Sequence, residues 1–376
     1  MTLPRPEVDP DGLLEYSVVF TDRSLNHMSQ RFVRAMQDLV EVLGTTYHAR
    51  TVAVVPGGGS YAMEAVARQL ATGRRCLVVR NGLFSYRWSQ ILAAGAISDE
   101  VTVCAARPLD GSVHAQWRPA PVDEVVAAIR AGRPEVVFAP HVETAGGILL
   151  PDDYIRSVAA ATQEVGGTFV LDCIASGALW VDLADLGVDV LLSAPQKGGS
   201  GTPCAGYVML GEAGRATVEA TTSTSFAVDL KKWLAITEAY RRGESPYHAT
   251  LPTDSLAHNA AVMLETRDLG PERLRAAQVE LGTRVRALLA ERGFASVAAD
   301  GFAAPSVVVV HTDDPEIRSG ARFKGVGLQV AAGVPLMCGE PDGFSTFRVG
   351  LFGLDKLTDV DGTVARLRDA LDRLAG

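Results

Sequence analysis

Lys197 and Asp172 are the residues whose types and positions best fit catalysis. Lys197 lies in a loop of small residues, 193–203, directly after the apolar run 188–192. Asp172 directly follows the apolar run 168–171, so two neighbouring buried strands would place an acid and an amine at one edge of a sheet. A lysine that leaves a buried strand can lose its proton through desolvation and become an amine nucleophile, the state needed to form a Schiff base with an aldehyde. The plain alternatives are a solvated loop lysine and an aspartate that caps a helix or a turn.

A glycine-rich segment supplies a place for a phosphate group. Gly57, Gly58, Gly59 and Ser60 precede a helical pattern over residues 61–71. Small residues permit close approach, and the free amide groups at a helix N-terminus attract an anion. Pyridoxal 5'-phosphate needs a lysine for its Schiff base, a carboxylate that keeps its pyridine nitrogen protonated, and a phosphate cradle. The presence of all three elements in this order predicts a pyridoxal-phosphate enzyme, although the glycines alone would equally fit a simple turn.

The composition is that of an ordinary globular protein with an acidic balance. The 376 residues are 47% hydrophobic and 21% charged, which allows a large core and predicts two or three domains. A formal net charge of −9 opposes binding to nucleic acid, which requires a basic face. The five cysteines form no CxxC pair, and their odd number favours a reduced, cytoplasmic location. The sequence shows neither a secretory signal pattern nor an apolar run of membrane-spanning length, so we expect no membrane partner. We also expect no nucleic-acid partner and no bound metal ion.

Short β-branched runs alternate with helical patterns in the first half of the chain. The expected strands are 51–55, 76–79, 101–104, 136–139, 168–171, 188–192 and 206–210. Several of these runs are apolar without alternation, as expected for strands that helices cover on both faces. The sequence therefore predicts an α/β fold with a doubly wound, mainly parallel sheet. Ligands of such sheets bind beyond the carboxyl ends of the strands, where Asp172 and Lys197 lie.

The remaining segments predict a helix before this sheet and a smaller domain after it. Helical spacing of apolar residues is found over 32–43, 228–240, 254–267, 271–292 and 359–374, and the further strand candidates are 305–311 and 346–351. We expect an N-terminal arm over residues 1–15, a large domain over residues 16–268 and a small α+β domain over residues 269–376.

The order of Gly58-Gly59-Ser60, Asp172 and Ser193-Ala194-Pro195-Gln196-Lys197 resembles that of class V aminotransferases of fold type I, near the alanine:glyoxylate and serine:glyoxylate branch. The resemblance runs from about residue 16 to the end and includes segments 81–88 and 141–144. It implies a pyridoxal-phosphate-dependent transferase with a large cofactor-binding domain and a small C-terminal domain.

The resemblance also implies roles for the matched residues. Lys197 would form the Schiff base and move the proton during amino transfer, and Asp172 would bind the pyridine nitrogen. The further cofactor contacts that it implies are Gly58, Gly59, Ser60 and Gln196 for the phosphate, Phe84 for stacking on the ring, Thr144 for the ring hydroxyl, and Tyr247 and Thr250 for the phosphate of the neighbouring subunit. Core packing is the alternative for Phe84. A site shared in this way implies a homodimer.

Arg348 resembles the arginine of this family that binds the substrate carboxylate, because a guanidinium forms a bidentate fork with that group. A surface ion pair is the alternative. The implied reaction moves an amino group from a small α-amino acid, such as alanine or serine, to an α-keto acid, such as glyoxylate or pyruvate. The chain departs from its relatives near the substrate, with Ala145-Gly146-Gly147 after Thr144 and Leu351 where relatives have histidine, so donor and acceptor stay open.

Two other functions fit the same scaffold. Cys338 lies ten residues before Arg348, near the region where cysteine desulfurases keep their thiol, which makes a carbon–sulfur lyase the first alternative. Against it, Gln196 and Phe84 stand where desulfurases generally have histidine. The second alternative is a non-catalytic protein that holds pyridoxal phosphate as a ligand, although such a protein would need neither Lys197 nor Arg348.

Overall fold

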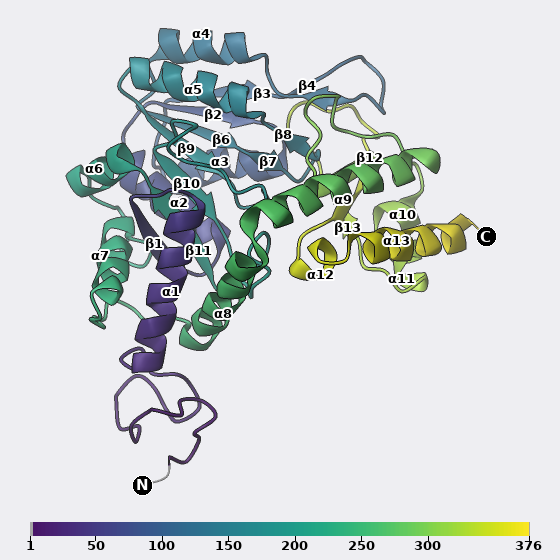
Figure 1. Ribbon diagram of the computed structural model, residues 1–376. Coiled ribbons are helices and arrows are strands. Elements are labelled where there is room, and N and C mark those ends of the chain that lie inside the picture. The colour runs from purple at the N-terminus through teal and green to yellow at the C-terminus, as the bar shows by residue number, and fades with distance from the viewer. Residues whose placement is uncertain (1–2, 376) are drawn as a thin grey trace.

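A seven-stranded sheet lies at the centre of the computed structural model, which describes residues 3–375 (Figure 1). Its strands in spatial order are β1 (Thr51–Pro56), β11 (Ala205–Leu210), β10 (Val190–Ser193), β9 (Thr168–Asp172), β6 (Val136–Pro140), β2 (Cys76–Arg80) and β3 (Val101–Ala105). β11 is antiparallel to β1 and β10, and the other neighbours are parallel. The seven predicted strands and the mainly parallel sheet are confirmed.

Helices cover this sheet, which explains why its strands are apolar without alternation. β6, β9, β10 and β11 are buried along their whole length, whereas no residue of β3, at the edge, is fully buried. The helices of this part are α1 (Gln30–Thr46), α2 (Gly59–Leu70), α3 (Leu83–Ala94), α4 (Val122–Gly132), α5 (Asp152–Glu164), α6 (Glu212–Ala220), α7 (Leu230–Arg241) and α8 (Thr253–Leu269). Figure 1 shows α4 and α5 along one side of the sheet and α1, α7 and α8 toward the opposite side. Two separate two-stranded sheets lie in the same part of the chain, β4 (Arg107–Pro108) with β5 (Trp117–Arg118) and β7 (Val142–Glu143) with β8 (Ile148–Leu149).

A second, three-stranded antiparallel sheet follows α8 in the chain. Its strands in spatial order are β12 (Val307–His311), β14 (Thr346–Gly350) and β13 (Ala331–Ala332). The helices around it are α9 (Pro271–Glu291), α10 (Pro315–Arg318), α11 (Ala321–Gly325), α12 (Leu354–Leu357) and α13 (Val360–Ala375). The two predicted strands and the predicted helices over 271–292 and 359–374 are confirmed, and a domain boundary near residue 268 stays a prediction. Residue 376 lies outside the described part.

The N-terminal segment, described from residue 3, has no helix or strand before α1 and extends away from the sheet (Figure 1). Residues 1 and 2 of the predicted arm lie outside the described residues. Leu13 and Tyr16 are each 90% exposed, and Val18 is fully exposed. Solvent-exposed apolar side chains that lie close together are typical of a surface that another molecule covers.

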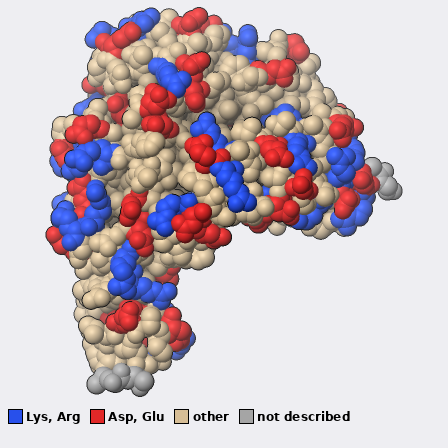
Figure 2. All heavy atoms as spheres, in the orientation of Figure 1, with Lys and Arg blue, Asp and Glu red and all other residues tan. Residues whose placement is uncertain are grey.

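Acidic and basic side chains are interspersed on the face shown in Figure 2. No helix within residues 3–375 is both long and apolar enough to cross a membrane. The same residues contain no group of three or more His, Cys, Asp or Glu side chains placed to hold a metal ion.

Candidate active site

Asp172 is the last residue of β9, and it pairs in register with Leu192 of the parallel strand β10. Its side chain is buried, and its carboxylate accepts a hydrogen bond of 2.9 Å from the backbone N–H of Ile174. Burial raises the pKa of Asp172 to about 6, although the Ile174 hydrogen bond and the nearby charge of Lys197 favour the ionised form. A buried carboxylate at this edge is suited to bind a cationic ring nitrogen.

Lys197 lies in the loop after β10, on the same side of the sheet as Asp172. Burial lowers the pKa of the Lys197 amine, and the positive charges of Arg348 and Arg87 lower it further, while Asp172 acts in the opposite direction. Its Nζ lies 4.9 Å from the centroid of the Phe352 ring. A lowered pKa increases the share of the Lys197 amine that is in the unprotonated, nucleophilic form.

Hydrogen bonds to two helices hold the Lys197 loop in place. Asn259 of α8 accepts hydrogen bonds from the backbone N–H and the hydroxyl of Thr202, at 2.7 and 3.1 Å. Ser200 accepts a hydrogen bond of 2.6 Å from the backbone N–H of Leu354. The loop is therefore fixed to α8 on one side and to α12 on the other.

The glycine segment before α2 brings the backbone close to the loop that follows Asp172. Gly57 has φ +117°, a conformation that favours glycine. A Cβ atom on Gly59 would lie only 2.6 Å from Cδ1 of Ile174, whereas a Cβ atom on Gly58 would meet no atom within 4 Å. Open space therefore faces the N-terminus of α2, where backbone N–H groups attract an anion.

Phe84 lies in the first turn of α3, and a buried carboxylate that the sequence analysis did not single out sets its position. Glu143 accepts hydrogen bonds from the backbone N–H groups of Phe84 (3.3 Å) and Ser85 (2.8 Å), from the Ser85 hydroxyl (2.7 Å) and from the backbone N–H of Ala145 (2.9 Å). Burial raises the pKa of Glu143, while these hydrogen bonds favour its charged form. Glu143 thus caps α3 and fixes the backbone from which the Phe84 side chain projects.

Arg348 approaches the same ring from β14 of the small sheet. Its Cζ lies 5.5 Å from the centroid of Phe84, and its Nε donates a 2.8 Å hydrogen bond to the carbonyl of Ala332. Within residues 3–375 it forms no ion pair. The surface ion pair considered from the sequence is absent there, which leaves the outer edge of the guanidinium for an anionic ligand.

The other predicted site residues differ in their exposure to solvent. Thr144 is buried next to Glu143, and Gln196 is exposed beside Lys197. The hydroxyls of Tyr247 and Thr250 lie 3.0 Å apart in the exposed segment between α7 and α8. Within residues 3–375 neither of those two side chains is hydrogen-bonded to the Lys197 loop.

Cys338 does not have the surroundings of a nucleophilic thiol. Burial raises its pKa to about 12, and its Sγ lies 3.5 Å from the carbonyl oxygens of Arg80 and Leu336. Because the thiolate is the reactive form of cysteine, a thiol with so high a pKa is protonated at neutral pH. The geometry therefore opposes the lyase alternative.

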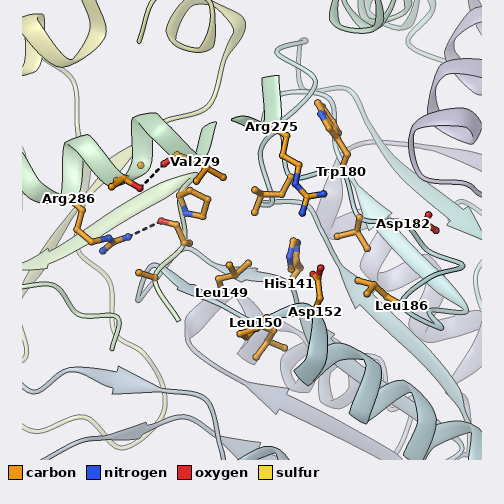
Figure 3. Close-up of a pocket in the computed structure, with 18 of the residues that line it drawn as sticks. His141, Leu149, Leu150, Asp152, Trp180, Asp182, Leu186, Arg275, Val279 and Arg286 are labelled. Carbon is orange, nitrogen blue, oxygen red and sulfur yellow. Dashed lines mark hydrogen bonds between the residues drawn. The ribbon is translucent and has the colours of Figure 1, made fainter. Parts of the chain in front are cut away.

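A cavity of about 690 Å³ lies elsewhere, between α5, the segment 179–186 and α9 (Figure 3). None of the residues predicted to bind cofactor or substrate lines it. His141 points into it, and its Nδ1 lies 2.7 Å from the Ser176 hydroxyl. Burial lowers the pKa of His141 to about 3, so this histidine is a neutral structural residue.

The residues at the sheet edge fit pyridoxal 5'-phosphate. The buried carboxylate of Asp172 suits the pyridinium nitrogen, the lowered pKa of Lys197 suits the aldehyde, and the open space at Gly58 faces a helix N-terminus that suits the phosphate.

Comparisons with known proteins agree with this assignment. The chain is 31% identical over 346 residues to the 2-aminoethylphosphonate–pyruvate transaminase of Burkholderia mallei, covering 90% of this chain and 87% of the relative. It is 30% identical over 325 residues to the enzyme of that name from Burkholderia ambifaria, covering 85% and 81%. Among solved structures, the alanine–glyoxylate aminotransferase of Nostoc sp. matches with a TM-score of 0.76 at 20% identity, covering 92% of this chain and 89% of that one. The pyridoxamine–pyruvate aminotransferase of Mesorhizobium loti matches with a TM-score of 0.76 at 17% identity, covering 94% and 87%. The chain matches no protein-family model.

The fold is that of a pyridoxal-phosphate-dependent transferase of fold type I. Within that class, the chain belongs to the class V aminotransferases, and it is a pyridoxal-phosphate-dependent aminotransferase. The predicted family, fold, cofactor and type of enzyme are confirmed.

Proposed function

We propose that this aminotransferase moves an amino group from a small donor to pyruvate or glyoxylate, with Lys197, Asp172 and Arg348 at its centre. The observation that carries the proposal is Arg348, a half-buried guanidinium without an ion pair in residues 3–375, which lies over Phe84 and lowers the pKa of Lys197. An α-amino acid and an α-keto acid both carry the carboxylate that such a guanidinium binds. We expect alanine or serine among the donors.

The cofactor-binding residues that we propose are Gly58, Gly59, Ser60, Phe84, Thr144, Asp172, Gln196 and Lys197 of one subunit. When bound, the cofactor would supply an electron sink for the reaction at the amino-bearing carbon of the donor. Lys197 holds the cofactor aldehyde through Nζ, and Asp172 holds the proton on the ring nitrogen. Lys197 Nζ would also be the base that takes up and returns the proton of the amino-bearing carbon of the donor.

We further propose a homodimer in the cytoplasm, with Tyr247 and Thr250 reaching the phosphate of the neighbouring subunit. The exposed apolar residues of the N-terminal segment and the exposed Tyr247–Thr250 pair support a second copy as the covering molecule. The five cysteines are all unpaired, which supports a reduced compartment.

A second candidate donor is 2-aminoethylphosphonate, which the names of the relatives at 31% identity favour. A phosphonate, like a carboxylate, is an oxyanion that a guanidinium binds with parallel hydrogen bonds. This donor would use the same Lys197 and Asp172, and it changes only the group that Arg348 holds.

A panel of donors tests the proposal. Alanine, serine and 2-aminoethylphosphonate are each mixed with the purified enzyme, and the absorbance of the bound cofactor is followed before and after glyoxylate, pyruvate or 2-oxoglutarate is added. At least one donor should change the spectrum, and glyoxylate or pyruvate should restore it. Release of sulfide from cysteine that depends on Cys338, with no keto acid restoring the spectrum, would instead establish the lyase.

A further inference from the structure

Arg87 is a second cation at the candidate active site, beside Arg348, and the proposed function gives it no role. Its Nη1 donates a 2.8 Å hydrogen bond to the Ser60 hydroxyl, and its Cζ lies 5.2 Å from the centroid of the Phe84 ring. Within the described residues it forms no ion pair. The side chain therefore reaches from the ring-stacking residue to the first turn of α2.

The backbone of α3 holds Arg87 in this position. Phe84 and Arg87 are three residues apart in the helix, so they lie on one face of it. Glu143 caps the same helix through Phe84 and Ser85. The guanidinium is thus placed between two fixed points, the ring of Phe84 and the hydroxyl of Ser60, rather than free at the surface.

The charge of a phosphate monoester exceeds what a helix N-terminus alone balances. The group carries about two negative charges near neutral pH. The N-terminus of α2 offers roughly half of a positive charge. The proposed phosphate contacts Gly58, Gly59, Ser60 and Gln196 are all neutral, as are Tyr247 and Thr250. Among residues 3–375, Arg87 is the one Lys or Arg whose side chain is hydrogen-bonded to any of these.

We propose that Arg87 binds the phosphate of the cofactor, together with Ser60. The Ser60 hydroxyl accepts a hydrogen bond from Arg87, so its own proton remains to be donated to a phosphate oxygen. The remaining N–H groups of the guanidinium form charge-assisted hydrogen bonds with the same phosphate. This inference rests on the proposed function, because it requires that the site binds pyridoxal phosphate.

The competing role for Arg87 is to hold an acidic group of the substrate beside Arg348, since both guanidinium groups lie near the Phe84 ring. The two roles make different demands on the cofactor. A phosphate contact matters for pyridoxal phosphate and not for pyridoxal, which lacks the phosphate. A substrate contact affects neither cofactor form and changes only the KM of the substrate.

The test compares the affinities of pyridoxal phosphate and pyridoxal for the cofactor-free dimer, measured by equilibrium dialysis. Arg87→Gln should weaken the binding of pyridoxal phosphate about 10- to 100-fold, the range for losing hydrogen bonds to a charged group, and leave the binding of pyridoxal unchanged. Arg87→Lys should recover part of the loss. The control Arg273→Gln removes an exposed arginine of α9 and should change neither affinity.

A second measurement covers the case in which Arg87→Gln folds poorly. Inorganic phosphate should raise the thermal midpoint of the cofactor-free wild-type protein, and Arg87→Lys should retain more of this shift than Arg87→Gln. Equal preference for pyridoxal phosphate over pyridoxal in wild type and Arg87→Gln would overturn the assignment. If the wild-type protein binds no pyridoxal phosphate, the proposed function itself fails.

Discussion

The carboxylate of Glu143 accepts hydrogen bonds from both the backbone N–H and the hydroxyl of Ser85, at 2.8 and 2.7 Å. These two residues come from different parts of the chain, and their contact joins the short strand β7 to the N-terminus of α3. The direction in which Phe84 and Arg87 leave that helix depends on this contact. Glu143 therefore positions Phe84 and Arg87, the two side chains proposed to contact the cofactor, without contacting the cofactor itself.

Glu143→Ala should lower the free energy of unfolding by about 1 to 3 kcal/mol, because it leaves buried N–H groups without an acceptor. It should also weaken cofactor binding, since Phe84 and Arg87 lose a fixed support. Urea unfolding and cofactor titration measure the two effects. Glu265→Ala, which removes an exposed glutamate of α8, is the control. Similar results for both variants would show that Glu143 is not a positioning residue.

Asp172→Asn should reduce turnover by several orders of magnitude, because a neutral amide does not hold a proton on the ring nitrogen. The folded, cofactor-loaded variant should change its spectrum only slowly in a single turnover with the best donor. Turnover near that of the wild-type enzyme would mean that another acid has this role.

The same substitution should stabilise the cofactor-free protein at neutral pH. The folded-state pKa of Asp172 is raised from 3.8 to about 6, so its contribution to stability is present below about pH 4 and is lost as the pH rises through about 6. A shift of this size corresponds to about 3 kcal/mol. In urea unfolding of the cofactor-free proteins, Asp172→Asn should have a higher free energy of unfolding than the wild type at about pH 7. The two values should differ little at about pH 4. Equal pH dependence of the two proteins would contradict the buried, charged state that we describe.

Arg348→Ala should lower kcat/KM by a factor that corresponds to about 2 to 5 kcal/mol, the usual cost of truncating one member of a desolvated ion pair. Cofactor affinity should change little, because Arg348 is assigned to the substrate. Steady-state kinetics with the best donor measure the loss, and Arg318→Ala, at an exposed position of α10, is the control. An unchanged kcat/KM would remove Arg348 from the site.

Mixing two inactive variants tests whether the site is shared. Lys197→Ala carries one lesion, and the double variant Tyr247→Ala/Thr250→Ala carries the other. In a mixed dimer one site collects both lesions and the other has neither, so activity should return after subunit exchange. Mixed dimers that form, as seen by mass spectrometry, but stay inactive would count against a shared site.

Local patterns in the sequence were sufficient to predict the large sheet and the candidate catalytic pair. The fully buried strands β6, β9, β10 and β11 are continuous apolar runs, and Asp172 and Lys197 follow two of them directly. The two-residue strand β13 escaped prediction, because its residues are exposed and carry no periodic signal.

The residues missed at the site are those whose contacts are distant in sequence. Glu143 and Ser85 are 58 residues apart, so no local pattern marks their hydrogen bond. Phe352 meets Lys197 only because the segment after β14 lies against the Lys197 loop, where the Leu354 N–H also bonds Ser200. For Glu143 the available signal was a carboxylate within a segment matched to the family. Arg87 offered a cation one helical turn after the ring-stacking residue.

Reduction of the cofactor-loaded enzyme with borohydride, followed by peptide mapping, tests the central claim most directly. Borohydride converts a Schiff base between the cofactor and a lysine into a stable amine, so the modified residue is identified by mass spectrometry. We predict a pyridoxyl label on Lys197, with none in Lys197→Ala. A label on Lys231, Lys232 or any other lysine in place of Lys197 would contradict the account.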